Sequence, residues 1–348
     1  MAHEYLAVSE PRAVRFTLLD GLRGLAAFSV VCYHIGAAGQ PRLRDVGPWP
    51  LTSFLFIGYL GVPVFFVVSG FTIAWSLRNV KMSAPAFGRF LLRRSLRLDP
   101  PFWAAIALTI LLPYQKSAPA ASLGVVAANA FYVADLIGVA KLSSVYWTLF
   151  LELQFYCVLA GLLWLAAAGA GRRGWRAVAP VVLGALFLLS LLQPAIHWPD
   201  VRGLFIGTWY AFFVGACLAW FKAGRLKAPY LVLVALPVGL YAALRLTAFP
   251  VVVLVTGLLI LVATQKDALG SWLGGPSVQY LGRISYSLYL IHGPAGQRVT
   301  KFASRLGTSP TTAALAAVAG LATSLLAAHL LWRLVEVPSM RWSRSIQL

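Results

Sequence analysis

The chain has 348 residues, of which 60% are hydrophobic and only 11% are charged. A soluble core of ordinary size cannot hide that much apolar surface, so the composition excludes a soluble globular protein and indicates one that crosses a membrane several times. The net charge of +19 would favour nucleic acid as the partner of a soluble protein. Here the Lys and Arg residues lie in short clusters between apolar segments, which is typical of cytoplasmic membrane loops and argues against nucleic acid.

Eleven apolar segments follow one another along the chain. If all eleven cross from a cytoplasmic N-terminus, the 29 Lys and Arg residues divide almost evenly between the two sides. If the stretch 122–140 dips into the membrane without crossing, 20 of the 29 lie inside and 9 outside, in agreement with the positive-inside rule. The segments are 18–37, 54–78, 99–113, 122–140, 146–170, 177–195, 203–221, 229–246, 249–265, 284–300 and 312–335.

We therefore predict an all-α polytopic membrane protein, a bundle of about ten transmembrane helices with one re-entrant or short segment. Both termini are expected in the cytoplasm. The segments between the spans are short, so residues 1–348 are expected to form a single membrane-embedded domain with no appended soluble domain.

The first segment, LDGLRGLAAFSVVCYHIG, holds Arg23 and His34 eleven residues apart. In an α-helix this spacing is about 20° more than three full turns, with a rise of about 16 Å, so both side chains point the same way. Ionisable groups are costly inside a membrane and usually face a bundle interior or a wet cavity, which makes both residues candidates for function. The structural alternative is an Asp20–Arg23 ion pair at the helix mouth and a His34 that hydrogen-bonds a neighbouring helix.

The second apolar segment contains GVPVFFVVSGFTIAW, in which Ser69 is followed by Gly70. Such a small pair permits the close approach of another backbone or a kink. From the residues alone, helix packing is the favoured interpretation.

The densest positive cluster is RFLLRRSLRLDPPFW, in the loop that leads into the third segment. We expect it to be helical up to a break at Asp99-Pro100. Arg94 and Arg97 then lie three residues apart, beside Arg93, on a basic face at the cytoplasmic surface. Arginine makes bidentate contacts with phosphate oxygens, so this face suits a nucleotide-like ligand, and it suits anionic lipid head groups equally well.

Glu152 is the acidic residue placed most clearly inside an apolar segment, in VYWTLFLELQFY. Thr148, Glu152 and Tyr156 are spaced by four and share one helical face, so a structural role would bond Glu152 to Thr148 and to a neighbouring helix. A functional role would have Glu152 bind a polar substrate or hold an imidazole in one tautomer. The residues leave both roles open.

The tenth apolar segment begins within YLGRISYSLYLIHGP, which places Ser285, Tyr289 and His292 within two helical turns. His292 either binds substrate or satisfies a neighbour, and the residues favour the second. Glu336, at the end of the last span, is expected to pair with a loop arginine. The other histidines have no acidic or thiol neighbours at ligand spacing, so no metal site is expected.

In this order, these stretches resemble the acyltransferase 3 family of integral membrane acyltransferases over nearly the whole chain. The resemblance implies transfer of an acyl group, commonly acetyl, from a cytoplasmic acyl-CoA to a hydroxyl of a carbohydrate or glycosylated acceptor. It is carried by LDGLRGLAAFSVVCYH, FFVVSGF, RRSLR, WTLFLELQFY, ISYSLYLIH and VEVP.

A positioned imidazole that removes a hydroxyl proton suits this chemistry, because a hydroxyl is a poor nucleophile at neutral pH. We expect His34 to be that general base and Glu152 to meet the acceptor from the extracytoplasmic half as a second catalytic residue. The expected donor-binding residues are Arg23, Ser69, Arg94 and Arg97, and those that bind the acceptor or are structural are Trp147, Tyr289 and His292.

The expected co-substrate is acyl-CoA, with no permanently bound cofactor, and the expected location is the bacterial inner membrane. The competing class is a proton-coupled transporter or flippase, in which the buried ionisable residues would line a pathway for a proton or a polar solute. The absence of paired Gly/Pro-broken half-helices in the two halves of the sequence weakens that alternative. The oligomeric state stays open.

Overall fold

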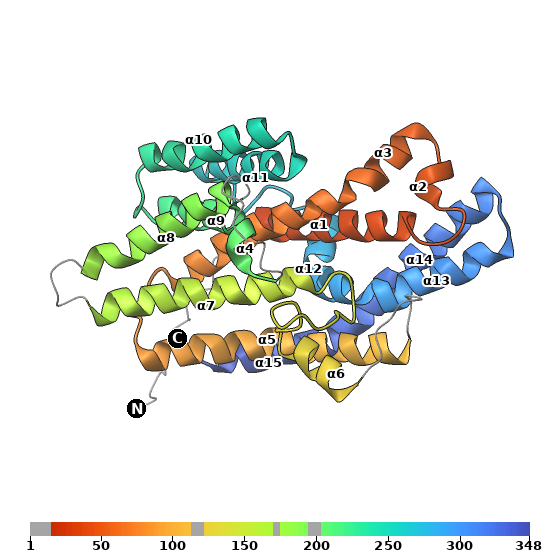
Figure 1. Cartoon of the computed structure of the whole chain (residues 1–348), viewed down its shortest axis with the longest axis horizontal. Coiled ribbons are helices and arrows are strands. Elements are labelled where there is room, and N and C mark those ends of the chain that lie inside the picture. The colour runs from red at the N-terminus through yellow and green to blue at the C-terminus, as the bar shows by residue number, and fades with distance from the viewer. Residues whose placement is uncertain (1–14, 113–121, 170–174, 194–202) are drawn as a thin grey trace, which may run out of the picture.

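A computed structural model describes residues 15–112, 122–169, 175–193 and 203–348, and every regular element in these ranges is helical (Figure 1). The last residues of the expected segments 99–113, 146–170 and 177–195 lie outside the described ranges. The α-helices are α1 (Thr17–Gly36), α2 (Leu43–Val46), α3 (Trp49–Ile57), α4 (Gly61–Leu77), α5 (Ala84–Leu111), α6 (Leu123–Ala130), α7 (Trp147–Ala168), α8 (Trp175–Leu192), α9 (Trp209–Lys222), α10 (Ala228–Arg245), α11 (Ala248–Gln265), α12 (Pro276–Ile291), α13 (Arg298–Ala303), α14 (Pro310–Leu331) and α15 (Val337–Ser345).

Seven helical stretches of the described chain are long and apolar enough to span a membrane, so the protein is an integral, multi-pass membrane protein. Three expected spans fall outside this set. The helix α5 contains several arginines, the apolar part of α8 covers only Val178–Leu192, and α12 has 16 residues. The ten-helix count and the cytoplasmic termini therefore stay predictions. The seven stretches are Thr17–Gly36, Trp49–Leu77, Trp147–Ala168, Phe205–Lys222, Ala228–Arg245, Ala248–Gln265 and Pro310–Ser345.

The stretch 122–140 contains only the eight-residue helix α6, followed by turns. A helix of that length covers about 12 Å, far less than the hydrocarbon core, which agrees with a segment that dips in without crossing. Asn129 holds the segment together. Its buried side chain donates to the carbonyl oxygens of Val125 (2.9 Å) and Ala140 (3.0 Å) and accepts from the backbone N–H of Leu142 (3.0 Å).

The helix break expected at Asp99-Pro100 is absent, because α5 continues without interruption to Leu111. A proline inside a helix removes one hydrogen bond, and neighbouring side chains in a membrane protein can compensate. The hydroxyl of Tyr286 on α12 donates to the carbonyl oxygen of Leu98 (2.8 Å), which anchors α5 beside the prolines and does not replace the bonds to Leu96 and Arg97 that the prolines remove. The Asp99 carboxylate accepts from the hydroxyl of Tyr132 (2.8 Å). Contacts from other segments thus hold α5 where the local rule predicts an end.

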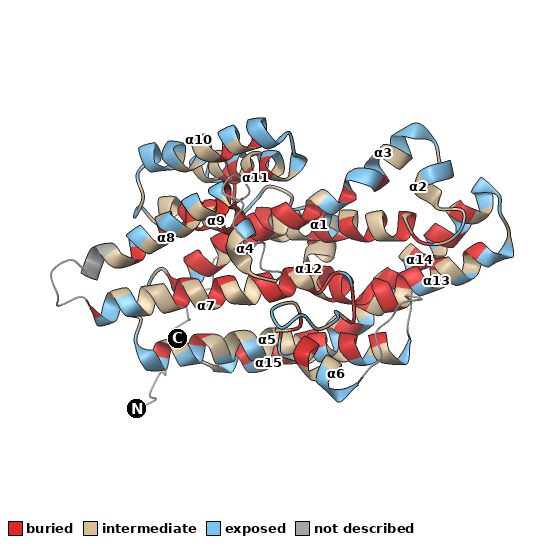
Figure 2. Ribbon diagram, in the orientation of Figure 1, coloured by how far each residue is buried: buried red, intermediate tan, exposed pale blue. Residues whose placement is uncertain are grey.

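Glycines set two of the closest helix contacts. A Cβ atom on Gly24 would lie 2.5 Å from the backbone nitrogen of Gly282, so only the lack of a side chain lets α1 and α12 pack this closely. A Cβ on Gly70 would lie 1.9 Å from the carbonyl oxygen of Phe212, so α4 and α9 approach each other here as closely as the prediction for Gly70 allows. Figure 2 shows buried residues concentrated on these four helices, whereas α10 is mostly exposed.

Candidate active site

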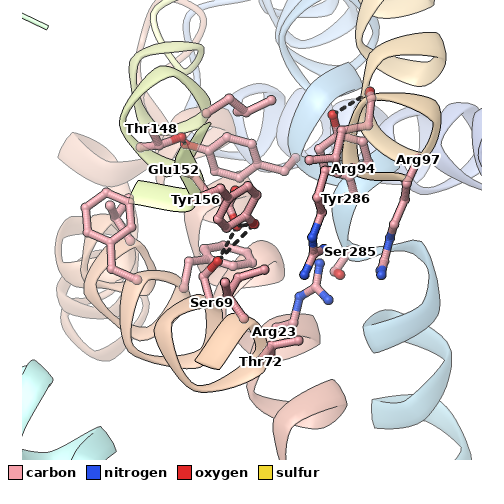
Figure 3. A pocket seen from close by; sticks show the side chains of 17 residues that line it. Arg23, Ser69, Thr72, Arg94, Arg97, Thr148, Glu152, Tyr156, Ser285 and Tyr286 are labelled. Atoms are coloured by element: carbon pink, nitrogen blue, oxygen red, sulfur yellow. Dashed lines mark hydrogen bonds between the residues drawn. The ribbon is translucent and has the colours of Figure 1, made fainter. Parts of the chain in front are cut away.

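A pocket with about 760 Å³ of empty space lies among α1, α4, α5, α7 and α12 (Figure 3). We call it the arginine pocket, after the three arginines that enter it from α1 and α5. Its remaining wall combines hydroxyl groups, one carboxyl group and apolar side chains. The lining residues are Arg23, Val62, Phe65, Phe66, Ser69, Thr72, Ile73, Arg94, Arg97, Leu98, Thr148, Leu149, Glu152, Tyr156, Ser285, Tyr286 and Tyr289.

The guanidinium groups of Arg23, Arg94 and Arg97 converge in this pocket (Figure 3). None of the three takes part in a salt bridge among the described residues. The Asp20–Arg23 ion pair considered from the sequence is wrong, because the carboxylate of Asp20 instead accepts from Nε of Arg15 at 2.8 Å. Three like charges repel one another, so their convergence favours a ligand with several negative charges.

Glu152 stands at the centre of a hydrogen-bond network on one wall of the arginine pocket. Its Oε1 atom accepts from both the Ser69 hydroxyl on α4 and the Tyr156 hydroxyl one turn along α7, and these two hydroxyl oxygens are 3.1 Å apart. The expected bond between Glu152 and Thr148 is not formed, since the Thr148 hydroxyl lies 2.8 Å from the hydroxyl of Tyr289 instead. The spacing along α7 identified the correct face, and the partner comes from α4.

Arg94 is linked to this network through an aromatic ring. Its guanidinium carbon lies 4.9 Å from the ring centroid of Tyr156, a cation–π contact that fixes the side chain near the carboxylate. Glu152 therefore lies with the arginines, and the expected separation between a donor end with Arg94 and an acceptor end with Glu152 is wrong.

His34 does not line the arginine pocket; it pairs with His292. The centroids of the two imidazoles are 5.1 Å apart. Tyr289 lines the pocket, and its ring centroid is 6.0 Å from that of His292. The buried Tyr289 ring therefore lies between the arginine pocket and the histidine pair. The sequence predicted Arg23 and His34 on one face of one helix, and α1 indeed carries both, with about 16 Å of rise between them.

His292 is fully buried at the C-terminal end of α12. Its Nδ1 lies 2.7 Å from the carbonyl oxygen of Tyr289, and a carbonyl oxygen can only accept, so Nδ1 carries the proton. In the neutral ring Nε2 then holds the lone pair. A π-helix over Gly293–Gln297 follows directly, a local form that is frequent at functional sites.

Two further predicted residues have structural partners. Trp147 packs edge-on against Phe66 (6.3 Å between ring centroids) and does not line the arginine pocket. The buried carboxyl group of Glu336 accepts from the Ser287 hydroxyl (2.6 Å) on α12. The ion pair expected between Glu336 and a loop arginine is not among the described salt bridges. Glu336 and Arg97 nevertheless interact electrostatically.

Sequence reasoning missed Tyr286, which both lines the arginine pocket and donates to the backbone of α5. The only signal in the sequence was its position next to Ser285 in the SYSLY stretch of mostly polar residues. No motif rule singles out such a residue.

Comparisons with known proteins agree with this arrangement. The model of the acyltransferase 3 family, described as an acyltransferase domain, matches residues 16–333. The exopolysaccharide production protein ExoZ of Rhizobium meliloti (strain 1021) is 28% identical over 317 residues, which cover 83% of this chain and 92% of that protein. BcsY of Komagataeibacter xylinus, named as a membrane-bound transacylase, is 28% identical over 79% of this chain and 72% of its own length.

A shorter match is to the acyltransferase MdmB of Streptomyces mycarofaciens, which is 39% identical over 90 residues, 26% of this chain and 22% of that protein. No solved structure matches the chain significantly. The family model covers nearly all of the described chain, including every residue of the arginine pocket and both histidines of the pair. The chain therefore belongs to the acyltransferase 3 family and is an enzyme that transfers acyl groups.

Proposed function

We propose that this enzyme moves an acyl group, in the simplest case acetyl, from acyl-CoA to a hydroxyl of a carbohydrate or glycosylated acceptor. The observation that carries the proposal is the convergence of Arg23, Arg94 and Arg97 in one pocket of a membrane protein. Coenzyme A carries phosphates at one end and the thioester at the other. A cationic pocket at one end of α1 and an imidazole about 16 Å along the same helix fit such an extended donor.

In this proposal the three guanidinium groups bind the phosphates of the donor. Bidentate arginine–phosphate contacts are stronger than neutral hydrogen bonds, and their planar geometry also orients the ligand. Ser69, Glu152 and Tyr156 act as positioning residues that hold Arg94 in place. We assign this end of the molecule to the cytoplasmic side, where acyl-CoA is available, and the membrane to the bacterial inner membrane.

His34 is the general base of the proposed reaction. The acceptor oxygen attacks the thioester carbonyl, and the imidazole takes the hydroxyl proton. A carbon–oxygen bond forms, the carbon–sulfur bond breaks, and the leaving thiolate recovers the proton from the imidazolium. Base catalysis of this kind contributes about 10²- to 10⁴-fold.

The alternative route is an acyl-imidazole on His34, formed first from the donor and then attacked by the acceptor. Rapid quenching with labelled acyl-CoA and no acceptor separates the two routes, because only the covalent route leaves label on the protein. The carbohydrate nature of the acceptor is proposed from the name of the exopolysaccharide production protein ExoZ, which aligns with most of this chain.

Calorimetry on the detergent-purified protein tests the proposal without knowledge of the acceptor. We expect acetyl-CoA and CoA to bind at micromolar concentration and a dephosphorylated analogue to bind much more weakly. The variants Arg94→Ala and Arg97→Ala should weaken acetyl-CoA binding. Arg89→Ala is the matched control, because Arg89 is an exposed arginine of the same helix that does not line the pocket. Failure of acetyl-CoA to bind, or binding independent of the phosphates, would remove the donor assignment.

A further inference from the structure

Three buried side-chain nitrogen atoms among the described residues have no hydrogen-bond partner: Nδ1 of His34, Nε of Arg44 and Nε2 of His292. An unpaired buried polar atom costs about 1–3 kcal/mol, so such atoms are rare and each requires an explanation. His34 and Arg44 come from the neighbouring helices α1 and α2, whereas His292 follows α12, far along the chain.

These three residues meet at the end of α1 opposite to Arg23. The His34 ring is 5.1 Å from the ring of His292 and 5.1 Å from the ring of Tyr33. The Arg44 guanidinium carbon lies 5.9 Å from the centroid of the Tyr33 ring. The electrostatic fields of His292 and Arg44 both act on His34. One small region thus contains every unpaired buried side-chain nitrogen or oxygen of the described chain.

Arg44 is held in place by contacts with aromatic rings, and its Nε atom has no hydrogen-bond partner. Its side chain is 19% exposed, and its guanidinium carbon also lies 5.2 Å from the Phe56 ring centroid. The nearest carboxylate, that of Asp45, is 3.8 Å from Nε, which exceeds hydrogen-bond length, and the Asp45 side chain is 49% exposed. A guanidinium fork oriented by aromatic rings is suited to bidentate contact with a carboxylate or a phosphate.

We infer that His34, His292 and Arg44 form the acceptor subsite, and that Arg44 selects a carbohydrate that carries a negatively charged group near the hydroxyl to be acylated. The inference rests on the proposed function, in which His34 is the base. His292 is the positioning residue: because its Nδ1 carries the proton, its unpaired Nε2 lone pair is available to the Nδ1–H of His34 when the imidazolium forms, and Nε2 of His34 takes the acceptor proton. The anionic group is a carboxylate of a sugar acid or the phosphate of a phosphorylated sugar.

Histidine side-chain NMR on the ¹⁵N-labelled protein in nanodiscs tests the inference, since the chain has only five histidines. Signals are assigned with single His→Gln variants. The probes are glucuronate, glucose 1-phosphate and neutral glucose. We expect glucuronate or glucose 1-phosphate to shift the signals of His34 and His292, and glucose to leave them unchanged at the same concentration. The arm that responds identifies carboxylate or phosphate as the recognised group.

Arg44→Gln should weaken binding of the responding anion at least tenfold, about 1.4 kcal/mol. Arg42→Gln is the matched control: it removes the same charge two residues away, and no contact of Arg42 with these rings is described. Equal affinity of Arg44→Gln and the unchanged protein, an equal response to glucose, or no response to either anion would overturn the inference. Calorimetry with acetyl-CoA on the same samples separates the two proposals. If the protein binds acetyl-CoA and neither anion, the proposed acceptor subsite is wrong and the donor assignment stands.

Discussion

The two ends of the closely packed α1–α12 pair satisfy their polar groups in opposite ways. At the arginine pocket the carboxyl group of Glu152 and the hydroxyls around it bond to one another, and a tyrosine ring orients Arg94. At the histidine pair, two ring nitrogens are buried without a partner. The network around Glu152 is complete by itself, whereas the histidine pair is incomplete.

This difference indicates a different task for each end. Preorganised charges that keep their geometry bind a charged ligand well, because little ordering is needed when the ligand arrives. A proton-transfer group instead needs a free lone pair that can change its partner during the reaction. The arginine pocket therefore fits a binding role and the histidine pair fits the chemical step, and substitutions at the two ends should change different kinetic parameters.

The largest effect is expected for His34→Ala. Loss of the base should lower the transfer rate by about 10²- to 10⁴-fold and leave acetyl-CoA affinity nearly unchanged. The measurement is transfer of labelled acetyl from acetyl-CoA to the envelope carbohydrate of membranes from the native host, together with calorimetric donor binding. His329→Ala is the control, because the ring of His329 bonds to the Tyr280 hydroxyl (3.0 Å) and neither residue lines the arginine pocket. Activity retained in His34→Ala would remove His34 as the base.

Arg97→Ala should change the KM for acetyl-CoA rather than the turnover. Hydrogen bonds to charged groups contribute about 1.5–3 kcal/mol, so we expect the KM for acetyl-CoA to rise about tenfold to hundredfold, with a much smaller change in turnover at saturation. The exposed Arg89 of the same helix, replaced by Ala, should leave both parameters as they were. If KM stayed constant while turnover fell, Arg97 would serve the chemical step and the binding role of the arginine pocket would be wrong.

His292→Phe keeps a ring of similar size and removes both nitrogens. If His292 accepts a hydrogen bond from the His34 imidazolium as it forms, turnover should fall about tenfold to hundredfold and the KM for acetyl-CoA should not change. A purely structural role would instead lower stability, measured as the Tm of the purified protein. A large loss of Tm with unchanged turnover per folded molecule would show that the imidazole only fills space.

Residue spacing within single helices predicted much of this site, but it could not predict the contacts between helices. The eleven-residue spacing correctly placed Arg23 and His34 on α1 with about 16 Å between them. The four-residue spacing along α7 found the polar face of Glu152 and gave the wrong partner, because Ser69 arrives from α4. A single sequence does not state which helices pack together, so the joining of His292 to His34 could not be predicted from spacing.

The fold shows the same limit. Apolar length identified most spans, and the short α6 agrees with the dip that the charge count required. The local effect of Pro100 predicted a break that α5 does not have, because Tyr286 and Tyr132 hold the helix from outside. Arg44 gave no signal in the sequence because it is one of two arginines in a polar loop, and only the folded chain places it beside Tyr33.

The smallest predicted effect separates the two contributions of Tyr156 to the arginine pocket. Tyr156→Phe keeps the ring against which Arg94 lies and removes the hydroxyl that donates to Glu152. The loss of one hydrogen bond of about 0.5–1.5 kcal/mol should weaken acetyl-CoA binding about twofold to tenfold, which calorimetry can resolve. Tyr210→Phe on α9, outside this pocket, should bind the donor as the unchanged protein does. A loss as large as that of Arg97→Ala would mean that the hydroxyl contacts the donor directly, whereas unchanged affinity would mean that the ring alone positions Arg94.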